Sequence, residues 1–247
     1  MKNLEGKVVF ITGGSRGMGA AIAKRLASEG ASIAFTHTGK SQEKADAVLD
    51  ALHSKGVKAL ALITDYRKSE ALISALKAAE EKLGKIDILV NNAGVYSQSE
   101  ITDITPDEYD QVMNVNVKDV FIASQYVANQ MKSGGRIITI GSNMGDRVSF
   151  SGGSLYAMSK SALIGLTKGM ARDLGARNIT VNLIQPGPVD TDMNPATAPH
   201  APTLINALAI KRYGTVEEIA GLVSYLSGNE SQFITGTAIT IDGGFNI

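Results

Sequence analysis

Tyr156 and Lys160 are the residues best suited to proton transfer, and they stand four positions apart in the segment YAMSK. The surrounding sequence predicts a helix from Ser154 to Ala176, and side chains four residues apart lie on one helix face. A tyrosine with an ordinary pKa of about 10 is a poor acid-base group at neutral pH, but a neighbouring cation favours its phenolate. The pair is therefore a candidate general acid or base with its cation, although this spacing also arises by chance on helix surfaces.

A glycine-rich loop, Thr12 to Gly19, follows the apolar segment KVVFIT and leads into a predicted helix from about Arg16 to Ser28. Its spacing, G-x-x-x-G-x-G, lets the backbone approach a pyrophosphate, whose charge is favoured at a helix N-terminus. The loop lacks the Gly-Lys-Ser/Thr ending of ATPase phosphate loops. The sequence therefore predicts dinucleotide binding rather than nucleotide hydrolysis.

The choice between NAD and NADP is normally made about 20 residues further on, where an acidic side chain binds the ribose of NAD. Here the sequence reads Thr36-His37-Thr38-Gly39-Lys40, without an acid. Lys40 and Arg16 could bind a 2′-phosphate. The pattern favours NADPH over NADH, although each of these residues alone could equally be a solvated turn residue.

Two polar groups follow apolar segments further along the chain. Asn91-Asn92-Ala93-Gly94 ends the segment IDILVNN, and Ser142 ends GRIITIGS. Because ligands of open α/β sheets bind at the carboxyl ends of the strands, we expect both groups to lie at the same site.

Seven short, nearly continuous apolar runs alternate with longer helical stretches, which is typical of parallel strands covered on both faces. The sequence predicts an α/β, Rossmann-type, doubly wound, seven-stranded parallel sheet with helices on both faces, in a single domain over residues 1–247. The runs are KVVFIT at 7, ASIAFT at 31, KALALIT at 58, IDILVNN at 86, GRIITIGS at 135, ITVNLIQ at 179 and TAITI at 237.

Two connections stand out. A long uninterrupted helix is expected from about Pro106 to Met131, with Thr105 as its N-cap. The segment Gln185 to Pro202 holds five of the six prolines, which indicates a functional lid over about residues 188–210.

Composition excludes several classes of function. The chain has no cysteine and only three scattered histidines, His37, His53 and His200, so no metal site is expected. Lys plus Arg and Asp plus Glu are both 24, which argues against a nucleic-acid partner. No apolar run reaches the roughly 20 residues of a membrane span, so we expect a soluble, cytoplasmic protein.

With these motifs in this order, the chain resembles the short-chain dehydrogenase/reductase superfamily, and within it the ketoacyl reductase and carbonyl reductase subgroup. The resemblance implies that Ser142 polarises a substrate carbonyl and that Tyr156 is the general acid or base. It implies that Lys160 supports Tyr156 and holds the nicotinamide ribose. The pattern N-x-x-x-V-F selects Asn116, which would anchor a water that links Lys160 to solvent. A buried asparagine bonded only to backbone is the alternative.

The resemblance also implies a set of cofactor contacts: the glycine loop at the pyrophosphate, Asp65-Tyr66 near the adenine, and the segment after residue 185 at the nicotinamide. The candidate cofactor-binding residues are Gly13, Ser15, Arg16, Gly17, Met18, Gly19, His37, Thr38, Asp65, Tyr66, Asn92, Ala93, Gly94, Tyr156, Lys160, Pro186, Gly187, Val189 and Thr191.

The expected function is reversible, NADPH-dependent reduction of a small-molecule ketone. Substrate choice should depend on three segments, Val95–Glu100, Asn143–Phe150 and Met193 to about Leu208. Asn143, Arg147 and Met193 are the candidate substrate residues, and Arg147 could meet a substrate anion.

Two alternatives remain open. The first is a 3-oxoacyl-[acyl-carrier-protein] or acetoacetyl-CoA reductase, but family members with such acidic partners carry arginines where this chain has Ser133 and Arg177. Lys132 and Arg136 lie close by and could partly substitute for the missing arginine. The second is a regulator that binds cyclic-di-GMP on a reductase fold. The family is commonly homotetrameric, so a homotetramer joined through the two long helices and the C-terminal strand is expected.

Overall fold

The seven apolar runs form the strands of one sheet in the computed structural model, which describes residues 2–40 and 42–247. Every neighbouring pair is parallel, and the order is β3-β2-β1-β4-β5-β6-β7. The predicted Rossmann-type arrangement is confirmed. The strands are β1 (Val8–Ile11), β2 (Ser32–His37), β3 (Ala59–Ile63), β4 (Ile88–Asn91), β5 (Arg136–Ile140), β6 (Thr180–Pro186) and β7 (Ala238–Ile241).

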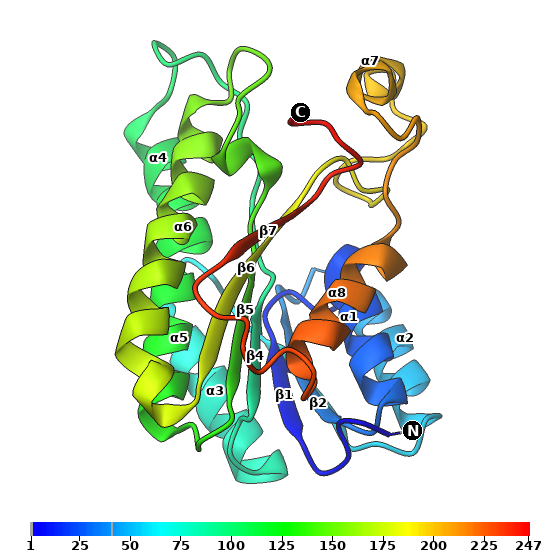
Figure 1. Cartoon of the computed structure of the whole chain (residues 1–247), viewed down its shortest axis with the longest axis vertical. Helices are drawn as coiled ribbons and strands as arrows, with labels where there is room; N and C mark the ends of the chain where they lie inside the picture. Colours follow the sequence, from blue (N-terminus) through cyan, green and yellow to red (C-terminus); the bar gives the residue numbers. More distant parts are fainter. Residues whose placement is uncertain (1, 41) are drawn as a thin grey trace.

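Helices cover both faces of the sheet, as Figure 1 shows. On one face pack α1 (Gly17–Ser28), α2 (Gln42–His53) and α8 (Val216–Ser227), and on the other pack α3 (Ser69–Leu83), α5 (Asp119–Gln130) and α6 (Ser154–Leu174). This two-sided burial explains why the strands are apolar without alternation. The strand order reverses between β1 and β4, and a doubly wound sheet opens a crevice at that point, beyond the carboxyl ends of the strands.

Local sequence signals determine where several helices start and stop. Thr105 caps the helix that starts at Pro106, since its hydroxyl accepts the N–H of Glu108 at 3.2 Å. Thr215 and Glu218 form a reciprocal capping box at the start of α8. These caps fix the helix ends against the sheet.

The expected long helix from Pro106 to Met131 is interrupted, so that prediction was wrong in its middle. It consists of α4 (Pro106–Met113), a π-helical turn (Asn114–Lys118) and α5. Periodicity did not signal the change because neither proline nor glycine marks it. Such widened turns occur frequently at functional sites, and this one contains Asn116.

The proline-rich segment after β6 runs along the outside of the cleft. It contains a short helix, α7 (Ala201–Ala207), and is tied to the body of the protein by a bridge between Val189 and Gly214. Two short 3₁₀ turns, Asn143–Gly145 and Gly175–Arg177, follow β5 and α6. Within the residues that the structure describes, no helix is long and apolar enough to cross a membrane.

Candidate active site

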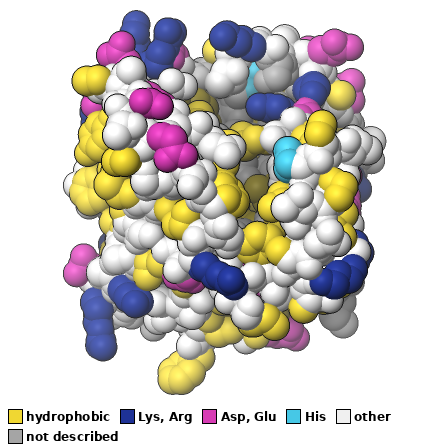
Figure 2. Space-filling model, turned by 90° about the horizontal axis from the view of Figure 1, so that it is seen from above, with side chains coloured by type: hydrophobic (Ala, Val, Ile, Leu, Met, Phe, Trp, Pro, Cys, Tyr) yellow, Lys and Arg dark blue, Asp and Glu magenta, His cyan; other side chains and the backbone are white. Residues whose placement is uncertain are grey.

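A cavity of about 1040 Å³ opens at the carboxyl edge of the sheet. Figure 2 looks onto this edge, where the surface is hollowed near its centre and hydrophobic side chains line part of the hollow. Of the residues predicted for the cofactor and the substrate, those lining the cavity are Gly13, Ser15, Arg16, Gly17, Met18, Gly19, His37, Thr38, Asp65, Tyr66, Asn92, Ala93, Gly94, Thr191 and Met193. The structure also adds Asp107, Asp110 and Gln111, which no sequence pattern singled out.

The glycine loop is held in place by the end of β4. The Asn92 side chain donates to the carbonyls of Thr12 at 3.0 Å and Gly13 at 2.8 Å. A Cβ atom at Gly19 would lie 2.2 Å from the Gly13 carbonyl oxygen, so only glycine fits there. The loop backbone is therefore pre-formed at the start of α1, as a pyrophosphate site requires.

At the far end of the cleft, Tyr66 is buried and its hydroxyl lies 2.5 Å from that of Thr36. Asp65 forms a bidentate pair with Arg67, which lowers the pKa of Asp65 to about 2. Burial lowers the pKa of His37, so its ring is neutral at pH 7. The positive charge that this end offers to a phosphate therefore comes from Arg16 and Lys40, both of which line the cavity.

The three predicted reacting side chains come together. The Ser142 hydroxyl lies close enough to the Tyr156 phenol to lower its pKa. The ammonium of Lys160 lies 5.6 Å from the centre of the Tyr156 ring and donates to the Ile140 carbonyl at 3.3 Å. Because Ser142 follows β5 while the other two come from α6, this cluster joins the sheet edge to the helix.

The expectation that Lys160 lowers the pKa of Tyr156 was wrong, because burial raises that pKa instead. Desolvation raises the pKa of Tyr156 to about 12, although the Ser142 hydroxyl lowers it in part. Burial lowers the pKa of Lys160 to about 8. Both shifts disfavour the charged forms, so the phenol is the resting state of Tyr156.

The π-helical turn directs Asn116 toward the loop after β4. Its side chain pairs with both backbone groups of Val95, accepting from the N–H at 2.9 Å and donating to the carbonyl at 3.0 Å. It also donates to the Ser159 hydroxyl at 3.0 Å. A Cβ atom at Gly94 would lie 3.4 Å from both the Asn116 Oδ1 and the Lys160 Nζ, so the two side chains flank the same point.

Tyr96 is a residue that the sequence analysis placed in a loop without assigning it a role. Its ring packs edge-on against Tyr156, with 5.0 Å between ring centres and 70° between planes. The only feature of the sequence that could have pointed to Tyr96 is its position as an aromatic residue just after the Asn-Ala-Gly motif. Tyr96 therefore forms a wall beside the phenol.

The candidate substrate residues have different surroundings. Met193 is exposed at the cavity. Asn143 is buried and hydrogen-bonds to Asp242 and Asn246, while Arg147 donates to the carbonyls of Phe245 and Ile247. Pro186, Gly187 and Val189 lie at the end of β6 and just beyond it, behind Thr191.

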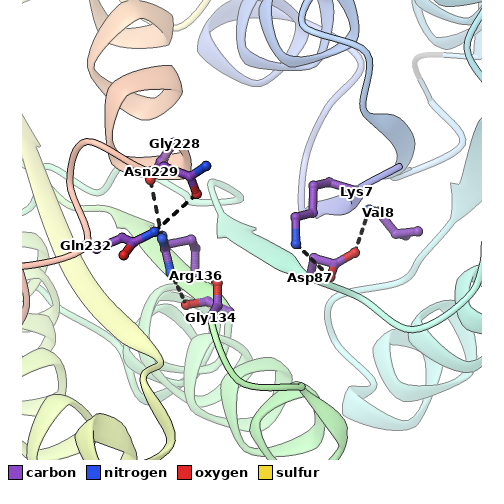
Figure 3. A network of polar contacts seen from close by, with 9 residues as sticks. Lys7, Val8, Asp87, Gly134, Arg136, Gly228, Asn229 and Gln232 are labelled. Atoms are coloured by element: carbon purple, nitrogen blue, oxygen red, sulfur yellow. Dashed lines mark hydrogen bonds and ion pairs between the residues drawn. The ribbon is translucent and has the colours of Figure 1, made fainter. Parts of the chain in front are cut away.

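The basic residues considered for an acidic protein partner lie at the opposite edge of the sheet, before β5 and β6. Arg177 donates to the Met131 carbonyl, and Ser133 accepts from Asn178. Arg136 is 4% exposed, and its guanidinium is held by the carbonyls of Gly134, Gly135 and Gly228 (Figure 3). The expectation that Arg136 could present a charge to a partner was therefore wrong. In the described part of the chain no group of three or more acidic or histidine side chains could hold a metal ion.

Comparison with known proteins gives consistent matches over nearly the whole chain. The family model described as Enoyl-(Acyl carrier protein) reductase matches residues 13–246. A cyclic-di-GMP-binding biofilm dispersal mediator protein of Escherichia coli K12 is 45% identical over 240 residues, covering 97% of each chain. The 3-oxoacyl-[acyl-carrier-protein] reductase FabG of the same strain is 37% identical over 245 residues, covering 98% of each.

Among solved structures, a short chain dehydrogenase from Burkholderia cenocepacia J2315 in complex with NADP is 48% identical. It superimposes with a TM-score of 0.97 over 99% of this chain and 100% of that one. Both the sequence and the fold therefore agree with the motifs in the cleft. The chain belongs to the short-chain dehydrogenase/reductase superfamily of oxidoreductases.

Proposed function

We propose that this protein is an NADPH-dependent oxidoreductase that reversibly reduces a ketone to the alcohol. The observation that carries the proposal is the cluster of Ser142, Tyr156 and Lys160 next to Gly94, because Gly94 itself lines the cleft that contains the pre-formed phosphate loop. Such a cleft suits a dinucleotide and a small second reactant.

The residues of the cleft fit NADPH. The loop from Gly13 to Gly19 would hold the pyrophosphate, and Arg16 and Lys40 would hold the 2′-phosphate. When bound, NADPH supplies the hydride for the reaction. The solved relative that contains NADP supports this choice of cofactor.

Ser142, Tyr156 and Lys160 would each have a separate role in the proton transfer. The Ser142 hydroxyl, which lies near Tyr156, would bind the substrate oxygen and bring it next to the phenol. Tyr156 would then donate its proton to that oxygen, and its resting state as a phenol suits this direction. Charged Lys160 would stabilise the phenolate left behind.

Asn116 would help to restore the proton that Tyr156 donates to the substrate. Its amide holds Val95 and Ser159, and its Oδ1 faces the same point as the Lys160 ammonium. A water bound there would connect Lys160 to solvent. Asn116 is thus bonded to a side chain as well as to backbone, which favours this role over a purely structural one.

Consumption of NADPH with a panel of small ketones, diketones and a β-ketoacyl thioester tests the proposal, with NADH run alongside. We expect turnover of ketones with NADPH at a higher kcat/KM than with NADH. If no carbonyl compound is reduced while the dinucleotide still binds, ketone reduction is refuted.

Two other functions have a specific observation behind them. Reduction of a 3-oxoacyl-[acyl-carrier-protein] is favoured by the identity to FabG, but the basic positions for such a partner lie away from the cleft. Binding of cyclic-di-GMP is favoured by the identity to the biofilm dispersal mediator. Tight binding of that dinucleotide without turnover of any ketone would reverse our ranking.

We also propose a single domain with a lid over residues 188–210, a cytoplasmic location and a homotetramer. Support for assembly comes from exposed apolar side chains on the two long helices, Phe121 on α5 and Met158 on α6, and from Phe233 near β7. Such side chains favour contact with another surface.

A further inference from the structure

We infer that Arg147 fastens the C-terminal segment Asp242–Ile247 to the active-site loop instead of binding the substrate, and that the site therefore selects uncharged, apolar ketones. The second half rests on the proposed ketone reduction. Arg147 is then a positioning residue, and the C-terminal segment is a wall of the reacting centre.

The C-terminal segment is bonded to the residue that directly follows Ser142. The Asn246 side chain donates to the Asn143 backbone carbonyl at 2.9 Å. In return the Asn143 side chain donates to the Asn246 Oδ1 at 3.3 Å and lies 3.4 Å from an Asp242 carboxylate oxygen. Because Asn143 is 5% exposed, these bonds form in a largely dry environment.

Asp242 shapes the segment and connects it to the predicted nicotinamide turn. Its carboxylate accepts the backbone N–H of Gly244 at 2.9 Å and that of Asn246 at 3.0 Å. A Cβ atom at Gly187 would lie 2.6 Å from the Cβ of Asp242, so the two backbones are in direct contact. The segment thus braces the loop that carries Ser142 against the turn at Pro186-Gly187.

Arg147 completes this brace from the outside. Its Nη1 donates to the carbonyl of Phe245 at 3.2 Å and to that of Ile247 at 3.3 Å. These two bonds hold the guanidinium against the C-terminal segment, and its remaining N–H groups stay on that side. A carboxylate or phosphate on the substrate would have to displace the end of the chain to reach it.

The charged residues on the three predicted substrate segments also favour an uncharged substrate. In the described segments 95–100, 143–150 and 193–208, Glu100 and Asp146 are the acids and Arg147 is the only lysine or arginine. With Arg147 counted, the two acids still leave these segments with a net negative charge, which disfavours carboxylates, coenzyme A and acyl carrier protein. The large apolar side chains exposed on these segments are Tyr96, Val148, Phe150 and Met193.

A matched pair of substrates tests this inference: ethyl acetoacetate is neutral, and acetoacetate presents the same ketone beside a carboxylate. We expect the wild type to prefer the ester by about tenfold or more in kcat/KM. Arg147→Gln and Asn246→Ala should lower kcat for both substrates by a similar factor, about 3- to 10-fold, because both loosen the same wall. The control Arg172→Gln removes an equal charge from an exposed position at the other end of α6 and should change neither value.

Hydrogen exchange gives a readout that needs no turnover. The amides of Gly244 and Asn246 should exchange faster in both active-site variants than in the wild type and the control. Unchanged exchange, a wild-type preference for acetoacetate, or an Arg147→Gln defect confined to the KM for acetoacetate would each overturn the inference. If the wild type reduces neither compound, the proposed function fails, and hydrogen exchange still decides whether Arg147 holds the C-terminal segment.

Discussion

At the scale of single residues, the site places a phenol and an ammonium in surroundings that disfavour charge on either. Burial raises the pKa of Tyr156 to about 12 and lowers that of Lys160 to about 8. Near neutral pH Lys160 is still protonated, and Tyr156 keeps the proton that reduction requires. The two shifts thus favour reduction over oxidation at physiological pH.

Reduction should therefore slow as the pH rises through about 8, because deprotonated Lys160 no longer stabilises the phenolate. Initial rates at saturating substrate, measured from about pH 6 to about pH 10, would show a falling limb. Lys160→Arg keeps its charge over this range, so any activity that it retains should lack that limb. A flat wild-type profile would contradict the assignment.

Asp192 should weaken the selectivity for NADPH. Its carboxylate pairs with the Lys44 ammonium and lies 3.7 Å from the Arg16 guanidinium, at the rim of the cleft. A 2′-phosphate competes with this carboxylate for Arg16. Asp192→Asn should tighten binding of adenosine 2′,5′-bisphosphate by about 3- to 10-fold and leave binding of 5′-AMP unchanged.

Isothermal titration measures both affinities without any need for turnover. Asp173→Asn, an exposed acid on α6, is the matched control and should alter neither. Weaker binding of the bisphosphate to Asp192→Asn would show that Asp192 orients Arg16 instead of competing for it.

Residue types and spacing were enough to predict that Ser142, Tyr156 and Lys160 come together. Tyr156 and Lys160 share a helix face, and Ser142 ends a strand, so local rules place them. The pKa shifts depend on which segments cover the site, and a sequence does not show that. Tyr96 was missed for the same reason, because its contact with Tyr156 joins positions 60 residues apart.

At the scale of elements, the π-helical turn between α4 and α5 gives Asn116 its position. Ordinary helical periodicity predicts the helices on either side but has no signal for one widened turn. The turn is maintained by tertiary bonds from Asn116 to Val95 and Ser159. This is why the boundaries of α4 and α5 could not be predicted although the helical character could.

Asp119, the first residue of α5, packs against the start of α3 and should cost stability at neutral pH. Burial raises its pKa to about 6, although the Ser69 hydroxyl donates to it at 3.1 Å. Because the folded pKa lies above the unfolded one, the cost is absent below about pH 4, grows as the pH rises from about 4 to about 6, and is complete above that.

Asp119→Asn should raise the free energy of unfolding at pH 8 by about 1–3 kcal/mol, and by much less at pH 4. Thermal unfolding at both pH values measures the difference, with Asp173→Asn as the control. An equal gain at both pH values would show that the effect is not due to the charge.

At the scale of the whole molecule, the sheet order could be predicted because seven apolar runs alternate with helices and parallel crossovers have few arrangements. The position of the site at the carboxyl edge could be predicted too, because ligands of such parallel sheets bind beyond the carboxyl ends of the strands. The path of the C-terminal segment could not be predicted, since its bonds to Asn143 and Arg147 cross about 100 positions of sequence.

The exposed apolar side chains on α5 and α6 should be covered in a homotetramer. Light scattering coupled to size exclusion should give about four times the chain mass of 25.9 kDa. Phe121→Glu should reduce that mass, since a charge would be buried in the contact, whereas Glu217→Gln on α8 should not. A wild-type monomer would refute the assembly.

The most direct test of the central claim is NADPH consumption by Tyr156→Phe alongside the wild type, with binding of NADPH measured on both. The substitution removes only the phenol hydroxyl, so we predict loss of nearly all ketone turnover with NADPH affinity largely kept. Ketone reduction at the wild-type rate by Tyr156→Phe would contradict the account.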